Sequence, residues 1–228
     1  MRESKMHVTP IFARNNYILM NKLYACCLYL LAFSATTFSQ NDAAAKKVLD
    51  AVGAKVKAAK GITANCVLNS FTSKGKPNGT KAISLQMKGD KYLIKQGKLE
   101  IICDGSNVYS FDGEKTITKS SVDENNQTLS PQKLLSGSYD KDFTYKLISS
   151  KGAFYEIEMK PIDNRKNFQK VNLFIDKAKN TFSKARILDK SNNITELKVS
   201  VLNLGAAVAD SKFVFNKNNY PKDVEILD

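Results

Sequence analysis

After Gly61 the chain alternates polar and apolar residues with a period of two, and only short turn signals interrupt the alternation. Gly89-Asp90, Asp104-Gly105 and Asp112-Gly113 are typical of tight turns between strands. Parallel strands need a crossover of a dozen or more residues, and these connections leave no room for one. The pattern therefore predicts an antiparallel sheet that is largely a meander.

The pattern predicts about eleven strands. They cover residues 62–72, 80–88, 91–96, 98–103, 107–111, 115–119, 143–149, 154–160, 168–175, 183–188 and 194–202. A flat open sheet rarely holds so many strands, so we expect the sheet to curl. The fold class is mainly β with some α, that is, α+β.

One helix is expected before the sheet, over residues 43–60, with Asn41 or Asp42 as its cap and Gly61 closing it. Its apolar residues recur every three or four positions, and the other face carries Lys46, Lys47, Lys55, Lys57 and Lys60. We favour a helix packed on the domain with a solvated lysine face over a basic helix lying on a membrane. A second, short helix is expected at 130–136, where Ser130 precedes Pro131.

The first 39 residues have the composition of an export signal. Lys22 precedes an apolar run of 11 residues (23–33), and small or hydroxylated residues follow up to Gln40. The run is too short for the roughly 20 residues that cross a bilayer as a helix. We expect residues 1–39 to be a signal peptide cleaved near Ser39, and 41–228 to be a single domain. Met20 leaves open an over-extended start, and a lipoprotein signal ending at Cys26 is the disfavoured alternative.

The only histidine, His7, lies in this leader, so residues 41–228 contain none. This absence excludes Ser-His-Asp and Cys-His catalysis and histidine-ligated metal sites from the mature domain. Loss of the leader changes the net charge from +13 to +10, with 31 positive and 21 negative residues left. Only two of these positive residues, Arg165 and Arg186, are arginines, and so few arginines argue against nucleic-acid binding. We expect no cofactor and no metal.

The remaining reactive groups also argue against an enzyme. Cys66 and Cys103 fall on the first and fourth predicted strands, and because two strands separate them we expect two free, buried thiols. Glu156 and Glu158 share one strand face about 7 Å apart and could imitate a catalytic carboxylate pair. A lysine-flanked surface ladder is the favoured interpretation. We therefore expect no catalytic residues.

Several strands are apolar on both faces. Ile101 and Ile102 point to opposite sides of one strand, as do Val108 and Tyr109 on the next. One face can pack a core while the other lines an apolar space. The alternative is that the helices cover the second face, or that it exposes some aromatic residues.

Local motifs along almost the whole expected mature domain resemble one known family. They are GITAN at 61–65, MKGDKY at 87–92, EIICDG at 100–105, LSPQKLL at 129–135, LFID at 173–176 and DSKFVFN at 210–216. In this order and spacing they resemble the LolA family, the periplasmic carriers of outer-membrane lipoproteins, in the form found in Bacteroidetes.

The resemblance implies an incomplete antiparallel β-barrel whose concave side is covered by the N-terminal helix and a short lid helix at 130–136, and which holds acyl chains. It places the cavity lining on the early strands and the lid. The candidates are Ile83, Leu85, Met87, Tyr92, Ile94, Ile101, Tyr109, Leu134 and Leu135. Familiar members carry an arginine on the second strand that hydrogen-bonds to the lid, whereas Lys88 stands in this stretch and lacks the planar fork.

By this resemblance, the expected function is to carry lipoproteins through the periplasm from the inner to the outer membrane. The implied partners are acylated lipoproteins, an inner-membrane lipoprotein-releasing ABC transporter and an outer-membrane acceptor, and we expect a monomer. The alternative function is a half-barrel interaction protein that senses lipids or misfolded proteins in the cell envelope.

Overall fold

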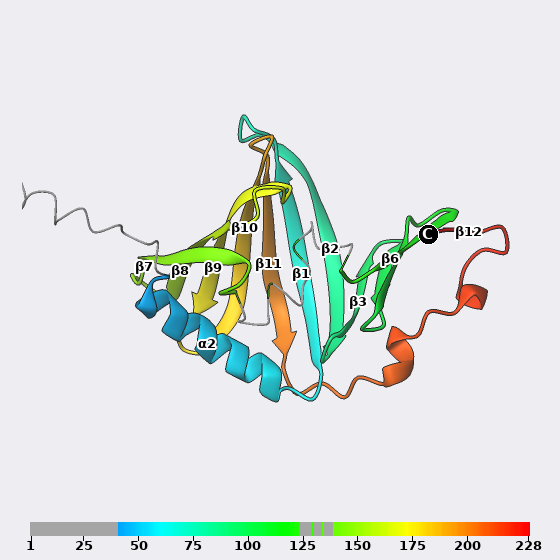
Figure 1. Ribbon diagram of the computed structural model, residues 1–228, viewed down its shortest axis with the longest axis horizontal. Coiled ribbons are helices and arrows are strands. Elements are labelled where there is room, and N and C mark those ends of the chain that lie inside the picture. Colours follow the sequence, from blue (N-terminus) through cyan, green and yellow to red (C-terminus); the bar gives the residue numbers. More distant parts are fainter. Residues whose placement is uncertain (1–40, 124–128, 130–133, 135–138) are drawn as a thin grey trace, which may run out of the picture. The chain divides into compact units, whose positions relative to one another are not determined.

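In the part of the chain that the structure describes, twelve strands form one sheet, and a helix lies across its concave side (Figure 1). The structure is a computed structural model that describes residues 41–123, 129, 134 and 139–228. The expected signal peptide lies outside the described residues. So does the expected short helix at 130–136, except for Leu134, which is helical.

All eleven predicted strands are present, and no strand end differs from the prediction by more than three residues. The strands are β1 (Ile62–Phe71), β2 (Pro77–Lys88), β3 (Lys91–Gln96), β4 (Leu99–Cys103), β5 (Asn107–Phe111), β6 (Thr116–Ser121), β7 (Phe143–Ser149), β8 (Phe154–Pro161), β9 (Phe168–Asp176), β10 (Thr181–Asp189), β11 (Ile194–Asn203) and β12 (Glu225–Leu227). The sequence analysis missed β12, which has three exposed residues and pairs with β6 in parallel.

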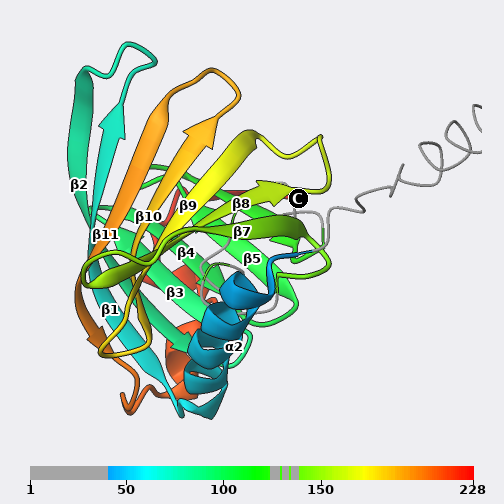
Figure 2. The same cartoon turned by 90° about the vertical axis from the view of Figure 1, so that its left-hand side faces the viewer.

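The strand order is β12-β6-β5-β4-β3-β2-β1-β11-β10-β9-β8-β7. The sheet therefore consists of two antiparallel meanders, β1–β6 and β7–β11, joined where β1 pairs with β11. Residues far apart in the chain meet at this junction, as Thr63 does with Asn203. Figure 2 shows the strongly curled sheet that results. In the described part of the chain β12 and β7 form its two ends and do not pair, so the barrel is incomplete.

Helix α2 (Ala43–Ala58) begins at Asp42, whose carboxylate accepts hydrogen bonds from the amides of Ala44 and Ala45. Ala45, Leu49, Val52 and Gly53 are buried, and the helix packs on β7 and β10. All five lysines of its predicted polar face are exposed. These contacts confirm a helix packed on the domain. No helix among the described residues is long and apolar enough to span a membrane.

Gly61 does not close the helix, as was expected, because α2 ends at Ala58 with Ala59 as its C-cap. Instead Gly61 forms a bridge with Gly205 just before β1 begins. A Cβ atom at Gly61 would lie 2.4 Å from the carbonyl oxygen of Ala206. This close approach of two backbones explains the glycine.

The two faces of the sheet are covered differently. The concave face carries the main core, which includes Leu49 and Val52 of α2 as well as residues from nearly every strand. The outer face of β3–β5 carries a second cluster made of Leu93, Ile102 and Phe213, with Tyr109 packed against it. The chain after β11 supplies Phe213, which ends the short 3-10 helix η2 (Asp210–Phe213).

The C-terminal segment thus covers the second apolar face of β3–β5. The ring of Tyr109 stacks on Phe215 with 4.3 Å between centroids, and Phe215 in turn stacks on Tyr220. The Tyr220 hydroxyl donates a hydrogen bond of 2.5 Å to Glu100, and burial raises the pKa of this tyrosine. The segment after β11 therefore covers this face, which was expected to line an apolar space, to lie under the helices or to expose aromatic residues.

Candidate functional site

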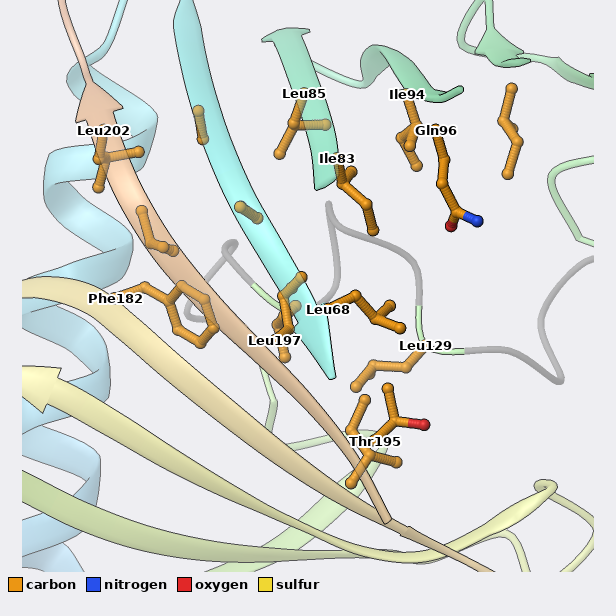
Figure 3. Close-up of a pocket in the computed structure, with 16 residues that line it drawn as sticks. Leu68, Ile83, Leu85, Ile94, Gln96, Leu129, Phe182, Thr195, Leu197 and Leu202 are labelled. Atoms are coloured by element: carbon orange, nitrogen blue, oxygen red, sulfur yellow. The ribbon is translucent and has the colours of Figure 1, made fainter. Parts of the chain in front are cut away.

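A cavity of about 280 Å³ lies on the concave face of the sheet (Figure 3). Strands β1–β4, β10 and β11 supply its lining, together with two residues from the connection between β6 and β7. The lining residues are Ala64, Cys66, Leu68, Ile83, Leu85, Ile94, Gln96, Ile101, Leu129, Leu134, Phe182, Ile187, Thr195, Leu197, Val199 and Leu202. Fourteen of these sixteen side chains lack a hydroxyl or an amide group, so the cavity is apolar.

Strand register brings these side chains together. Ala64 lies opposite Leu85, Leu85 opposite Ile94, and Ile94 opposite Ile101, so one row crosses four strands on a single face. Because side chains alternate between faces, the lining residues of β2, Ile83 and Leu85, and those of β3, Ile94 and Gln96, are two positions apart. The pairing of β1 with β11 continues the lining into the second meander, through Val199 opposite Cys66.

Two of the lining residues, Phe182 and Leu202, also border α2, beside Val52 and Val56. The amide and the hydroxyl of the described lining come from Gln96, the last residue of β3, and Thr195, the second residue of β11. The first six residues of β2 are exposed.

Five of the nine predicted cavity residues line this cavity: Ile83, Leu85, Ile94, Ile101 and Leu134. Met87 borders a second cavity of about 250 Å³ with Ile62 and Val56, near the end of α2. Tyr92 is buried in the main core, where desolvation and then Cys103 raise the pKa of its hydroxyl to about 12. Tyr109 lies on the outer face against Phe215, and Leu135 is outside the described residues.

Sequence reasoning missed the contribution of the second meander. Phe182, Ile187, Leu197, Val199 and Leu202 come from β10 and β11. The alternation within 194–202 places Leu197 and Val199 on one face of their strand. Nothing local indicates that this side faces the early strands, because that depends on a pairing between β1 and β11.

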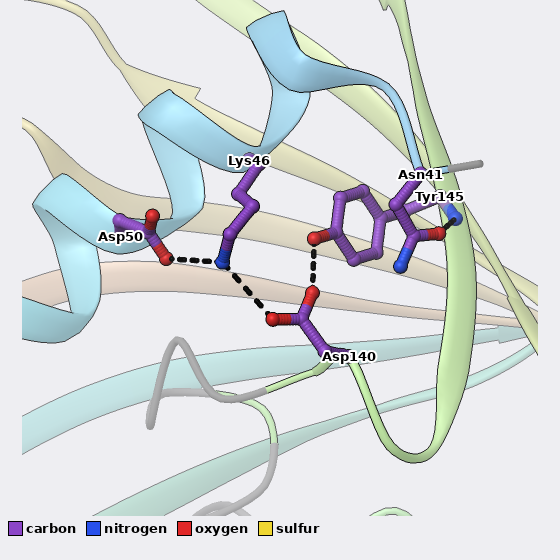
Figure 4. Close-up of polar contacts among 5 residues, drawn as sticks. All are labelled: Asn41, Lys46, Asp50, Asp140 and Tyr145. Atoms are coloured by element: carbon purple, nitrogen blue, oxygen red, sulfur yellow. Dashed lines mark hydrogen bonds and ion pairs between the residues drawn. The ribbon is translucent and has the colours of Figure 1, made fainter.

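The chain around Leu134 is tied to α2 by polar contacts (Figure 4). The Tyr139 hydroxyl donates a hydrogen bond of 2.5 Å to the Leu134 carbonyl. Lys46 of α2 pairs with Asp140 at 3.0 Å and with Asp50 at 3.2 Å, and the Tyr145 hydroxyl donates to Asp140. The Tyr145 bond and the Lys46 pair lower the pKa of the Asp140 carboxyl.

Lys88, the residue in place of the family's arginine, contacts the C-terminal segment. Its ammonium lies 2.6 Å from Asp210, and Lys91 lies 3.6 Å from the same carboxylate. Both lysines therefore hold η2 beside the turn between β2 and β3. In the described part of the chain the polar anchor next to Leu134 involves Lys46, not Lys88.

The reactive groups are not arranged for catalysis. Cys66 and Cys103 are free and buried, as predicted, and burial raises the pKa of both thiols. Glu158 accepts a hydrogen bond of 2.7 Å from Lys170, which lowers the pKa of its carboxyl, and Glu156 accepts one from Asn172. These contacts confirm the lysine-flanked ladder. No group of three potential metal ligands occurs within the described ranges.

Comparison with solved structures found several similar chains. An uncharacterised conserved protein from Thermus thermophilus is 13% identical, with a TM-score of 0.53 over 81% of this chain and 98% of that chain. A LolA superfamily protein from Nitrosomonas europaea is 13% identical, with a TM-score of 0.44 over 75% of this chain and 97% of that one. Lipoprotein LppX from Mycobacterium tuberculosis is 12% identical, with a TM-score of 0.44 over 74% and 100%.

At 13% identity, the Thermus thermophilus protein shows a similarity of fold alone. No curated protein matches the chain significantly in sequence. The sequence model of one family does match, over residues 94–216, which is more than half of the chain. The matched part runs from β3 into the C-terminal segment and includes most of the cavity lining. The chain therefore belongs to the LolA family, described as outer membrane lipoprotein carrier protein.

Proposed function

We propose that this protein is a periplasmic carrier that holds the acyl chains of lipoproteins in its concave cavity and transfers them from the inner to the outer membrane. The apolar cavity beneath α2 carries this proposal. It is lined almost entirely by aliphatic side chains, which suit a flexible hydrocarbon better than a polar substrate. Family membership supports the choice of a lipoprotein as cargo.

Energetics define what such a carrier must do. Transfer of three acyl chains, with roughly 45 carbons in all, from a membrane into water would cost about 36 kcal/mol of free energy, at about 0.8 kcal/mol per CH₂ group. Noncovalent affinities do not exceed roughly 20 kcal/mol. The protein therefore need not bind so tightly; it must offer surroundings similar to a membrane, so that loading and release are nearly balanced.

The proposal includes no catalysis. Residues 41–228 contain no histidine. In β8, Glu158 pairs with Lys146 and Lys170, and Glu156 accepts a hydrogen bond from Asn172. Export by the signal-like residues 1–39 would bring the protein to its cargo. An inner-membrane ABC transporter and an outer-membrane acceptor are the partners that a shuttle requires, and a net charge of +10 favours encounters with acidic surfaces.

Site-specific photo-crosslinking in living cells tests the proposal. A crosslinking residue at Leu85 or Leu134, in the cavity, should give adducts with many different acylated lipoproteins. The matched control is Lys95, which lies next to Ile94 but is exposed on the outer face of β3. Its lipoprotein adducts should be few.

Two outcomes would refute carriage. One is a single dominant, non-acylated adduct at the cavity positions, which would favour the sensor function. The other is an equal lipoprotein yield at Lys95, which would mean that the contacts do not arise in the cavity. Mass spectrometry of the lipids and proteins that co-purify with the protein provides an independent check.

A further inference from the structure

The hairpin that joins β1 to β2 projects beyond the other strands (Figure 1 and Figure 2). We call residues 69–82 the β1–β2 tip, and within it every residue of 73–82 is exposed. The cavity lining on β1 ends at Leu68 and that on β2 begins at Ile83, so the tip continues from one wall of the cavity. A surface that the tip contacts therefore lies at the end of this wall.

The β1–β2 tip carries only positive charge. Lys74, Lys76 and Lys81 are exposed, and the chain has no aspartate or glutamate between Asp50 and Asp90. None of the three lysine side chains forms an ion pair or a hydrogen bond within the described part of the chain. Their ammonium groups are therefore available to an anionic partner.

The neighbouring turn between β10 and β11 does not neutralise this charge. It lies beside the tip, since the Ser73 amide donates a hydrogen bond of 3.1 Å to the side chain of Asn193. The carboxylate of Asp189 in this turn accepts hydrogen bonds from the amide and the side chain of Asn193. Glu196 of β11 pairs with Lys184 at 3.5 Å. Both carboxylates are thus engaged locally.

The composition of the tip favours a membrane surface over a protein partner. Stable protein interfaces have aromatic or other large apolar side chains at their centre. None of the exposed large apolar side chains of the described residues lies in 69–82. The exposed residues of the tip are lysine, glycine, serine, threonine, asparagine, proline and alanine. Such a lysine-bearing surface suits anionic lipid headgroups, which attract basic segments without requiring a complementary shape.

We propose that the β1–β2 tip docks the protein reversibly on membrane surfaces that contain anionic phospholipids, through Lys74, Lys76 and Lys81. Their attraction to the surface decays over roughly 10 Å in 0.1 M salt, so it holds the protein at the headgroups without inserting it. The docking rests on the proposed function, because a carrier must approach membranes to load and release. It adds which part of the molecule faces the membrane at those steps.

Co-sedimentation of the purified protein with lipid vesicles tests the docking. Wild-type protein should prefer phosphatidylcholine vesicles with about 30% phosphatidylglycerol over vesicles of phosphatidylcholine alone, and added salt should reduce this preference. The combined variant Lys74→Gln, Lys76→Gln and Lys81→Gln should bind the anionic vesicles at least about 20-fold more weakly, because each lysine near the surface contributes about fivefold. The variant Lys74→Arg, Lys76→Arg and Lys81→Arg keeps the charge and should bind within about threefold of wild type.

The matched control removes three other exposed lysines, in and just after α2. Lys47, Lys57 and Lys60 also lack an ion pair among the residues that the structure describes. The combined variant Lys47→Gln, Lys57→Gln and Lys60→Gln lowers the net charge by the same amount and should bind within about threefold of wild type. An equal loss in the tip variant and this control would show that only net charge acts. A larger loss in the control would assign the contact to α2, and either result overturns the proposal.

The remaining outcomes separate the docking from the proposed function. Equal wild-type binding to neutral and anionic vesicles overturns the docking, as expected if the tip lysines serve an acidic protein instead. Carriage is tested separately, by the crosslinks at Leu85 and Leu134, since the vesicle assay contains no lipoprotein. If those crosslinks fail while the tip variant loses vesicle binding and the arginine variant retains it, the docking stands and carriage fails.

Discussion

Asp42 performs two tasks at the start of α2, and its replacement should measure how firmly this helix is held. One carboxylate oxygen, Oδ1, accepts hydrogen bonds from the amides of Ala44 at 2.8 Å and Ala45 at 3.3 Å. The other, Oδ2, accepts one of 2.9 Å from the amide of Leu147 in β7. The same side chain therefore caps the helix and ties it to the second meander.

The two tasks allow an estimate of the cost of Asp42→Ala. Loss of an N-cap costs about 1 kcal/mol. Leaving the part-buried Leu147 amide without an acceptor costs about 1–2 kcal/mol more. We expect the free energy of unfolding to fall by about 2–3 kcal/mol in total. Asp42→Ser should keep the cap but lose the tether, so its loss should be about half as large.

Urea unfolding followed by circular dichroism measures these differences. An unchanged m-value, the slope of the unfolding free energy against urea concentration, would show that only the stability has changed. Asp50→Ala is the control, because its exposed pair with Lys46 contributes at most about 0.5 kcal/mol. A loss below about 0.5 kcal/mol for Asp42→Ala would refute the double role.

The pH dependence provides a second check on Asp42. The Leu147 amide and the two helix amides lower the pKa of this carboxyl below its ordinary value of 3.8. A lowered pKa means that the folded state favours the ionised form. The stabilisation is therefore complete above pH 3.8 and disappears as the pH falls through the folded-state pKa. The difference between wild type and Asp42→Ala should shrink over that acid range, and a constant difference would contradict the reasoning.

Three further predictions follow from the packing. Gly61→Ala places a Cβ atom 2.4 Å from the Ala206 carbonyl oxygen and should cost about 1–3 kcal/mol of unfolding free energy. Gly205→Ala, in the same bridge, meets nothing closer than 3.7 Å and should cost less than about 0.5 kcal/mol. Phe213→Ala should cost about 3–5 kcal/mol because the ring is 1% exposed, whereas Val214→Ala, 61% exposed, should have almost no effect in the same urea titration. The Cys66 thiol, buried and with a raised pKa, should react with iodoacetamide at pH 8 far more slowly than an exposed cysteine, and palmitic acid should slow it further; rapid alkylation, read from the Cys66 peptide by mass spectrometry, would contradict its place in the cavity.

The sequence by itself determined the local elements of this protein. Alternation with a period of two and tight turns located eleven strands, and the spacing of apolar residues located α2. The predicted positions of these strands also separated Cys66 from Cys103, so that no disulfide was expected, and both cysteines are free. These features could be predicted because each depends on neighbouring residues, whose backbone preferences and side-chain directions act over a few positions.

Other features required the tertiary structure. Alternation divides a strand into two faces but does not say which face is concave, and so Tyr109 was placed in the cavity although it stacks on Phe215 outside it. The position of Gly61 after the helix predicted a helix cap, but the tertiary structure requires a glycine there because the Ala206 carbonyl oxygen lies close to it. The short strand β12 has no apolar pattern of its own and depends on β6 for its hydrogen bonds.

The cavity depends above all on the pairing of β1 with β11, which joins residues about 130 positions apart. No local signal encodes this pairing, because the two strands are far apart in sequence and meet only when the two meanders assemble into one sheet. It brings Leu197 and Val199 of β11 to the same cavity as Leu85 of β2, and Phe182 of β10 lines this cavity where it borders α2. The sequence thus determined which residues are apolar, and only the long-range pairing decided that they surround one space.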